Sequence, residues 1–421
     1  MTRPIETTYG FDTVCVVGLG YIGLPTAAFI ASKGLQVIGV DINPAYVERI
    51  NRGEVPFFEP DFEATLAGVV AQRRLVAQTS TPQADAYIVA VPTPFTTDHE
   101  ADLSYIEAAA RSIAPQLRGG ELIVLESTSP PGATDRLAEI ILQQRPDLST
   151  TDGTPTSVYF AHCPERVLPG RIMLELAEND RVIGGLSPRA TELARDLYGT
   201  FCSGELLLTD AVTAEMAKLT ENAFRDVNIA FANELSIICD KLGIDVWELI
   251  ELANHHPRVN ILNPGPGVGG HCIAVDPWFI VAAAKDEAGL IRQARKVNDS
   301  KPDFVLQKVC GLAGRFRAPT IAALGISFKA DIDDLRESPA VEIVNDLAQR
   351  LPRADIRVVE PHVDSLPNRL AQHTNVQKQD LESAIADCDI VLMLVDHSAF
   401  KRLDRAAVDE KILVDTRGVW R

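Results

Sequence analysis

Residues 14–25 read VCVVGLGYIGLP, and this stretch decides the fold of the first part of the chain. An apolar run typical of a buried strand leads into Gly18, Gly20 and Gly23 in G-x-G-x-x-G spacing, and an alanine-rich helix is expected over Leu24–Lys33. The first glycine permits a tight turn, the second lets a pyrophosphate approach the backbone, and the third allows close packing of helix on strand. Strand, glycine turn and helix together predict a dinucleotide site at the helix N-terminus.

Asp41 ends the next expected strand, LQVIGVD. A carboxylate there accepts hydrogen bonds from ribose hydroxyls and repels a 2′-phosphate, which favours NAD over NADP. The alternative is a plain strand–turn–helix with an acidic loop. Tyr21 and Ile22 lie inside the glycine motif, and Thr93 in VPTP and Thr128 in ESTSPPG follow two later strands. Open α/β sheets hold ligands at the carboxyl ends of their strands, so these four residues are expected to contact the cofactor.

Strands alternate with helical patterns as far as Leu125, which indicates a doubly wound parallel sheet, and strands near 157–162 and 181–184 are expected to continue it. Long helices follow, including one candidate over 213–243, and strands return after Pro319. The fold class is therefore α/β, with two Rossmann-like doubly wound domains joined by a long central helix. The expected parts are an NAD-binding Rossmann-like domain over 1–205, a central helical region over 206–310, and a second Rossmann-like domain over 311–421.

Composition restricts the partners of this chain of 421 residues. It has 40 Lys and Arg against 58 Asp and Glu, a net charge of −18, which argues against nucleic acid and anionic membranes as partners. The N-terminus lacks the apolar core of a signal peptide, and no apolar run is long enough to cross a bilayer. The seven cysteines are scattered without metal-ligand spacing, so a cytoplasmic protein without a metal site is expected.

Cys272 stands out among the cysteines because it lies in GVGGHCIAVDPWF, directly after a glycine-rich stretch. Gly269 and Gly270 let the backbone close around a ligand, and a helical turn starting at Cys272 would favour the thiolate. Asp276, four residues on, opposes thiolate formation, so it is expected to orient the thiol or to handle its proton. The alternative is a small buried hydrophobic residue, the usual state of a lone cysteine.

The long helix places Lys218, Asn222 and Arg225 on one stripe, at i, i+4 and i+7. Such a stripe is usually a solvated face, but its neighbours mix polar and apolar side chains and favour a half-buried ligand wall; these neighbours are Thr220, Phe224, Asn228, Ile229, Phe231 and Asn233. Two further loops, HCPERVLPG with Glu165 and Arg166 and HHPRVN with Arg258 and Asn260, carry charged groups. The second of these loops is expected to serve a pyrophosphate or a partner subunit.

Several segments occur in an order that resembles the UDP-glucose/GDP-mannose dehydrogenase superfamily, over nearly the whole chain. They are GLGYIGLP, ESTSPPG, CPERVLPG, KLTENAFRDVNIAFANEL, HPRVN, GPGVGGHC, FKADIDDLRESP and DTRGVW. Within the superfamily, HHPRVNILNPGPGVGGHCIAVDPWF and CPERVLPG resemble its amino-sugar branch most. The resemblance implies a four-electron oxidation of UDP-N-acetyl-D-mannosamine at C6, with NAD, without metal, through a thiohemiacetal and a thioester on Cys272. It also implies a homodimer in which Arg258 reaches the substrate of the neighbouring subunit. In the resemblance, residues 206–310 are the dimerisation and catalytic region, and residues 311–421 are the UDP-sugar-binding domain.

The resemblance also assigns roles to individual residues. Lys218 matches a lysine that stabilises an oxyanion or moves a proton, and Asn222 matches its hydrogen-bonding companion. Glu165 and Thr128 match residues that handle water and protons, and Arg336 matches a cofactor contact. The implied substrate contacts are Glu165, Arg166, Val167, Lys218, Asn222, Arg225, His256, Arg258, Asn260, Gly269, Phe328, Lys329 and Arg417.

Three other functions compete with this hypothesis. UDP-N-acetyl-D-glucosamine differs from the implied substrate only at C2, so a UDP-N-acetyl-D-glucosamine 6-dehydrogenase is the nearest alternative. A two-electron hydroxy-acid dehydrogenase would need neither Cys272 nor a second nucleotide-binding half. An inactive regulator that binds NAD or a nucleotide sugar would have no reason to carry Cys272, Lys218, Glu165 and Asp276 together.

Overall fold

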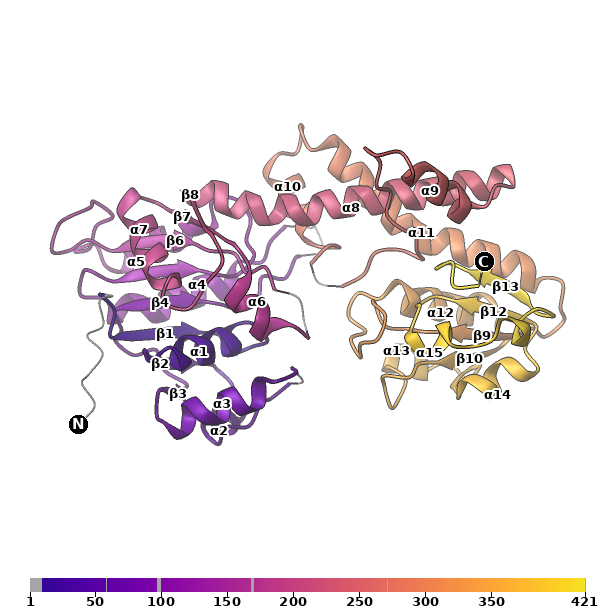
Figure 1. The fold of residues 1–421 in the computed structure, drawn as a ribbon, viewed down its shortest axis with the longest axis horizontal. Coiled ribbons are helices and arrows are strands. Elements are labelled where there is room, and N and C mark those ends of the chain that lie inside the picture. Colours follow the sequence, from indigo (N-terminus) through magenta and orange to yellow (C-terminus); the bar gives the residue numbers. More distant parts are fainter. Residues whose placement is uncertain (1–9, 58, 97–99, 168–169, 271, 421) are drawn as a thin grey trace. The chain divides into compact units, whose positions relative to one another are not determined.

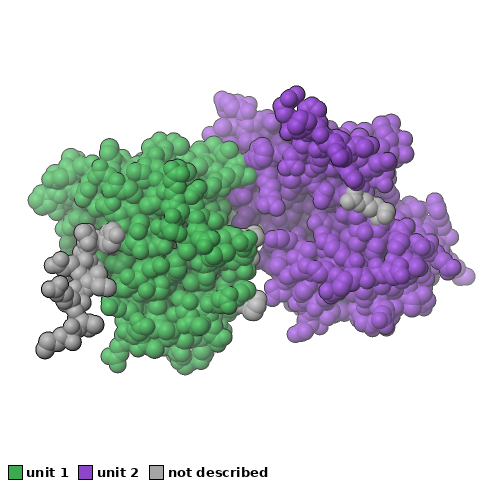
Figure 2. Space-filling view, viewed as in Figure 1, with its two compact units in different colours: residues 1–221 green, residues 222–421 purple. Residues whose placement is uncertain are grey.

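The structure, a computed structural model, describes residues 10–57, 59–96, 100–167, 170–270 and 272–420. The chain forms two compact units, residues 1–221 and residues 222–421 (Figure 2). Each unit holds a sheet with a hydrophobic core on both faces of it. The division into three parts stays a prediction, because the second compact unit contains most of the central helices as well as the second sheet.

Within the described residues, the first unit contains an eight-stranded sheet in the order β3-β2-β1-β4-β5-β6-β7-β8 (Figure 1). Its strands are β1 (Thr13–Val17), β2 (Gln36–Val40), β3 (Leu75–Gln78), β4 (Ala86–Val89), β5 (Leu122–Leu125), β6 (Tyr159–His162), β7 (Arg181–Gly185) and β8 (Leu206–Asp210). Its helices are α1 (Gly23–Ser32), α2 (Pro44–Asn51), α3 (Phe62–Ala71), α4 (Ser104–Ile113), α5 (Ala133–Gln144), α6 (Ile172–Glu178) and α7 (Pro188–Tyr198).

Helices cover both faces of this sheet. Apolar side chains of α1, α3 and α7 pack on one face, and those of α4 and α5 pack on the other. The central strands β4 and β5 are buried along their whole length, which explains their continuous apolar sequences. The predicted doubly wound α/β architecture is confirmed.

The expectation that all strands run parallel is wrong at β7, which is antiparallel to β6. In the described part of the connection from β6 to β7, the only helix is α6, which has 7 residues. At about 1.5 Å per residue, such a helix is too short to carry the chain back along the sheet. The chain therefore enters β7 from the carboxyl edge where β6 ended. Helix α7 then returns the chain, and β8 is parallel to β7.

Helix α8 (Ala211–Leu242) has 32 residues and confirms the long helix expected over 213–243. It begins in the first unit and ends in the second. The other helices of the second unit are α9 (Val246–Asn254), α10 (Asp276–Ala283), α11 (Gly289–Ala313), α12 (Pro339–Arg350), α13 (Asn368–Ala371), α14 (Leu381–Ala386) and α15 (Ser398–Lys401). None of the helices in the described ranges is long and apolar enough to cross a membrane.

In the part of the second unit that the structure describes, β9 (Thr320–Leu324), β10 (Asp355–Val359), β11 (Val376–Lys378), β12 (Ile390–Met393) and β13 (Ile412–Asp415) form a parallel sheet. Its order, β11-β10-β9-β12-β13, repeats the order β3-β2-β1-β4-β5 of the first unit. A left-handed glycine follows the first strand of each sheet, Gly18 at φ 95° and Gly325 at φ 85°. The two sheets are therefore variations on one strand order, with the same glycine turn after the first strand.

Candidate active site

The glycine turn leads from β1 into α1, and its three glycines meet different surroundings. A Cβ on Gly18 would lie 2.5 Å from the carbonyl oxygen of Ala90, and one on Gly23 would lie 1.9 Å from the carbonyl oxygen of Gly18. A Cβ on Gly20 would meet no atom within 4 Å. Gly18 and Gly23 are therefore required by the fold, whereas Gly20 leaves room for a ligand beside the start of α1.

Asp41 directly follows β2, the neighbour of β1, and its side chain is partly buried. Its carboxylate accepts hydrogen bonds from the backbone N–H of Leu19 at 3.1 Å and of Asn43 at 2.9 Å. Two backbone bonds fix its direction, and its remaining acceptor capacity suits the hydroxyls of a ribose. Ile42, next along the chain, is 88% exposed.

Thr93 and Thr128 follow β4 and β5, and the structure brings them together. The Thr93 hydroxyl donates to the carbonyl oxygen of Thr128 at 2.6 Å, and both side chains are partly exposed. Strand order reverses between β1 and β4, and ligands bind at such a switch point beyond the carboxyl ends of the strands. The open space at Gly20, the N-terminus of α1 and the carboxylate of Asp41 together fit a dinucleotide with free ribose hydroxyls.

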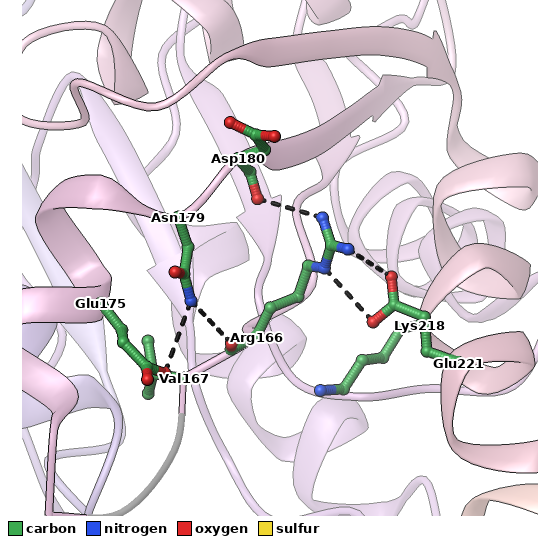
Figure 3. A pocket seen from close by; sticks show the side chains of 7 residues that line it. All are labelled: Arg166, Val167, Glu175, Asn179, Asp180, Lys218 and Glu221. Atoms are coloured by element: carbon green, nitrogen blue, oxygen red, sulfur yellow. Dashed lines mark hydrogen bonds and ion pairs between the residues drawn. The ribbon is translucent and has the colours of Figure 1, made fainter. Parts of the chain in front are cut away.

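A cavity of about 390 Å³ lies in the first unit, and Figure 3 shows its lining residues. They are Arg166, Val167, Glu175, Asn179, Asp180, Lys218 and Glu221. The guanidinium of Arg166 is paired with the Glu221 carboxylate at 2.6 Å and donates to the Asp180 carbonyl oxygen at 3.0 Å. These bonds hold Arg166 in the wall of the cavity. Lys218 also lines the cavity (Figure 3).

Glu165 precedes this wall and lies three residues after His162, the buried last residue of β6. Its carboxylate accepts a hydrogen bond from the Val167 backbone N–H. Burial raises the pKa of Glu165 to about 8, and the positive charge of Lys218 opposes that rise. A carboxyl group with a pKa near neutrality can take up and release a proton at working pH, which suits general acid–base catalysis.

Lys218 is positioned by the buried start of α8. Glu215, three residues before it, is 1% exposed and accepts hydrogen bonds from the backbone N–H of Gly132 at 2.6 Å and of Thr134 at 2.8 Å. These N–H groups stand at the beginning of α5, where a helix lacks internal acceptors. Glu215 thus caps α5 from a distant part of the sequence and fixes the turn of α8 that carries Lys218.

In the second unit, Cys272 is exposed and starts the turn that enters α10. Its carbonyl oxygen accepts hydrogen bonds from the backbone N–H of Val275 at 2.9 Å and of Asp276 at 2.8 Å. The expected helical turn at Cys272 is confirmed. Asp276 is 3% exposed and accepts a hydrogen bond from the Asn222 amide at 2.5 Å, so it orients that amide.

Asn233 does not line a ligand wall, because it is fully buried. Its amide donates to Asn298 of α11 at 2.9 Å, and its oxygen accepts the backbone N–H of Gly265 at 2.8 Å. Arg295 is also buried and pairs with Asp226 at 2.6 Å. This polar network joins α8 to α11 and anchors the start of the loop that leads to Cys272.

Three of the expected substrate residues meet at this loop. Phe328 lies over Gly270, whose Cβ would come within 2.9 Å of the phenyl ring, and a Cβ on Gly269 would lie 2.4 Å from a carbonyl oxygen. Arg417 lies beside Gly265, whose Cβ would be 2.6 Å from the guanidinium, and it pairs with Asp396 at 2.8 Å. These glycines let the loop approach the second sheet closely.

The remaining expected contacts are exposed in the described structure. Arg225 is exposed on α8, and Lys329 is exposed on the loop after β9. The Arg336 guanidinium pairs with Asp334 at 2.5 Å. The three expected residues of the loop after α9 are likewise exposed, namely His256, Arg258 and Asn260. Their contacts with cofactor or substrate stay predictions.

Comparison with known proteins identifies the family. The UDP-glucose/GDP-mannose dehydrogenase family matches with its NAD binding domain at residues 12–202, its central domain at 212–300 and its UDP binding domain at 322–421. The chain belongs to this family. It is therefore an NAD-dependent UDP-sugar dehydrogenase, an oxidoreductase whose substrate carries UDP, and this favours the enzyme over the inactive regulator.

Relatives of this dehydrogenase carry two kinds of name. An NDP-N-acetyl-D-galactosaminuronic acid dehydrogenase of Ralstonia nicotianae is 56% identical, over 100% of this chain and 98% of the relative. A UDP-N-acetyl-D-mannosamine dehydrogenase of Escherichia coli is 53% identical, over 98% of this chain and 100% of the relative. The solved UDP-D-ManNAc dehydrogenase of Pyrococcus horikoshii is 36% identical with a TM-score of 0.86, covering 97% of this chain and 96% of that one.

Sequence reasoning missed four residues that line the cavity of the dehydrogenase. Glu175, Asn179 and Asp180 come from α6 and the residues after it, and the sequence pattern had not predicted this short helix. Glu221 stands three residues after Lys218 on α8, a spacing that places both on neighbouring faces of a helix. That spacing was the signal available in the sequence.

Proposed function

We propose that this dehydrogenase oxidises C6 of UDP-N-acetyl-D-mannosamine to a carboxylate, with Cys272 as the nucleophile. The observation that carries the proposal is the exposed Cys272 on the glycine loop, at a turn whose Asp276 holds the Asn222 amide. Overall, one primary alcohol, two NAD⁺ and one water give one carboxylate, two NADH and three protons. When bound, NAD accepts a hydride at each of the two oxidation stages.

The residues of the chain divide the remaining work. Lys218 stabilises the alkoxide of the sugar or takes its proton, and the Asn222 amide donates a hydrogen bond to the same oxygen. The Cys272 thiolate adds to the aldehyde, giving a thiohemiacetal that retains this reactive species, and its oxidation leaves a thioester. Glu165 then accepts a proton from the water that hydrolyses the thioester, aided by Thr128.

Counting NADH tests the stoichiometry. Purified enzyme supplied with limiting UDP-N-acetylmannosamine should form two NADH per sugar, measured by absorbance. One NADH per sugar indicates a simple alcohol oxidation, and none with any UDP-sugar indicates a binding protein. Cys272→Ser should abolish uronate formation and keep NAD binding, whereas the matched change Cys310→Ser on α11 should leave both intact. Acid formation by Cys272→Ser at the parent rate contradicts the thioester route.

One observation supports UDP-N-acetylgalactosamine as an alternative candidate substrate. The relative from Ralstonia nicotianae is named for a galactosaminuronic acid and shares 56% of its residues with this chain. UDP-N-acetylgalactosamine therefore joins UDP-N-acetylglucosamine as an alternative substrate. Values of kcat/KM for the three amino sugars rank them, and a preference of about tenfold or more for either alternative overturns the mannosamine assignment.

We also propose that the enzyme is a homodimer that pairs through α8. Phe224, Phe231, Ile238 and Leu242 are between 43% and 71% exposed and follow one stripe of that helix. A contiguous row of exposed large apolar side chains is typical of an interface. Phe224→Asp with Phe231→Asp should give a monomer by analytical ultracentrifugation, whereas Tyr105→Asp, an exposed aromatic position on α4, should not.

Mixing two inactive variants tests whether Arg258 serves the neighbouring subunit. If it does, heterodimers of Arg258→Ala and Cys272→Ser contain one complete site, and mixing restores part of the activity. If Arg258 serves its own subunit, every heterodimer lacks one group at each site and activity stays absent.

A further inference from the structure

Glu59 is a buried carboxylate that the proposed reaction does not use. It is 6% exposed and lies in the loop between α2 and α3. Its Oε2 accepts hydrogen bonds from the Tyr21 hydroxyl at 3.1 Å and from the Gly170 backbone N–H at 2.9 Å. Its Oε1 accepts the Ile172 backbone N–H at 2.8 Å. One carboxylate therefore ties the glycine turn to the beginning of α6.

The Tyr21 end of this connection is firmly supported. The Tyr21 ring packs against Phe57 with centroids 4.9 Å apart, and Phe57 stacks on Phe62 at 6.1 Å. The residue stands between Gly20, where a ligand has room, and Gly23, where α1 begins. A ligand at Gly20 would therefore lie next to Tyr21, whose hydroxyl is bonded to Glu59.

The other end of this connection is the start of α6, a helix that contributes Glu175 to the wall of the cavity that contains Lys218. Glu59 satisfies N–H groups at the start of α6, which have no acceptor within the helix. Glu175 lies on α6, and Asn179, which follows it, donates to the carbonyl oxygen of Arg166 at 3.1 Å (Figure 3). A change in the position of α6 therefore changes the shape of this wall.

We propose that Glu59 is a positioning residue through which occupancy of the glycine turn changes the affinity of the Lys218 cavity for the UDP-sugar. The inference rests on the proposed function, because it takes the cavity as part of the sugar site. In this proposal Glu59 contacts neither the C6 atom of the sugar nor the sulfur of Cys272, and it acts through Tyr21 and α6. Since coupling between two binding sites is reciprocal, the sugar also changes the affinity for NADH by the same factor.

The test measures binding of UDP-N-acetylmannosamine by calorimetry, with and without saturating NADH, a pair of ligands that cannot react forward. In the wild type, NADH should tighten sugar binding by about fivefold or more. Tyr21→Phe removes only the hydroxyl and should bring this factor below about twofold. Tyr105→Phe, on an exposed part of α4, should keep the wild-type factor.

Glu59→Gln gives a second variant, since an amide keeps the shape but offers one acceptor oxygen in place of two. It should also lower the coupling factor, and Glu63→Gln, an exposed position on α3, should not. A wild-type factor near one, or an unchanged factor in Tyr21→Phe, overturns the inference while the proposed function stands if the sugar is oxidised. Wild-type protein that neither binds nor oxidises the sugar overturns both.

Discussion

In the first sheet Asp41 follows the second strand, and in the second sheet Glu360 stands at the equivalent position after β10. Two hydrogen bonds recur in both sheets. The glycine N–H after the first strand donates to the last residue of the second strand, Gly18 to Val40 O and Gly325 to Val359 O, both at 2.8 Å. The next N–H donates to the acid, Leu19 to Asp41 at 3.1 Å and Ile326 to Glu360 at 2.8 Å. Asp41 is partly exposed, whereas Glu360 is 2% exposed and also binds Ser327 N–H and His397. The same backbone arrangement thus leaves its acid partly exposed in the first sheet and uses it entirely for internal hydrogen bonds in the second.

Two fully buried histidines show the same contrast. His397 in the second unit lies 3.1 Å from the Glu360 carboxylate through Nε2, and its Nδ1 accepts the Asp331 N–H at 2.9 Å. His162 at the end of β6 has no hydrogen-bond partner for either ring nitrogen among the described residues, and burial lowers its pKa to about 3. Among the described residues, the first unit therefore leaves the ring of its buried histidine without a hydrogen-bond partner at a strand end, whereas the second unit holds the ring of its buried histidine in two hydrogen bonds.

Removing Glu360 should give the largest effect. Glu360→Ala leaves the backbone N–H groups of Ile326, Ser327 and His362, together with the His397 ring, without their acceptor. This should cost about 3–5 kcal/mol of unfolding free energy. Asp41→Ala should cost less than about 1.5 kcal/mol, because its carboxylate is partly solvated. Urea unfolding compares the two variants. Equal losses would break the contrast between the acids.

Removing the Asp41 carboxylate should instead weaken the binding of the cofactor. A hydrogen bond from ribose to a carboxylate contributes about 1.5–3 kcal/mol, so Asp41→Ala should lower NADH affinity by about 10–100-fold and reduce the preference over NADPH. Fluorescence titration with both nucleotides measures this. A Glu360 variant that folds at low temperature should retain wild-type NADH affinity, and a loss there would contradict the assignment of roles.

The buried His162 should make the first unit sensitive to acid. Its pKa is lowered in the folded chain, so the unfolded chain binds more protons between about pH 6.5 and pH 3, and stability falls as pH falls through this window. Between pH 7 and pH 5 the loss should be about 2 kcal/mol. His162→Leu should lack this slope in urea unfolding at the two pH values, and the exposed His255→Leu should keep it.

The smallest effect concerns Glu165. With a pKa raised to about 8, its carboxyl is mostly protonated at pH 7, so a reaction that needs the ionised form should speed up by about tenfold between pH 7 and pH 9. The rate of uronate formation under saturating NAD measures this. Glu165→Gln should be slow and should show no such rise, and a wild-type rate that falls over this range would contradict a base role.

The sequence predicted the fold well wherever one local pattern dominates. Gly18, Gly23 and Asp41 predict the first sheet because the backbone itself requires small or acidic residues at these positions. The uninterrupted helical pattern of α8 predicts that helix. The reversed β7 was not predictable, because it depends on where the short α6 leaves the chain. The partners of Asn233 and Glu59 were not predictable either, since they come from segments far away in the sequence.

The spacing around the three glycines has a consequence for mutational tolerance. Alanine at position 18 or 23 collides with backbone in the empty protein, so its rejection in a selection experiment reports on folding alone. Alanine at position 20 collides with nothing, so its rejection would report on the bound nucleotide. A library that varies these three codons therefore separates selection for folding, at positions 18 and 23, from selection for nucleotide binding, at position 20.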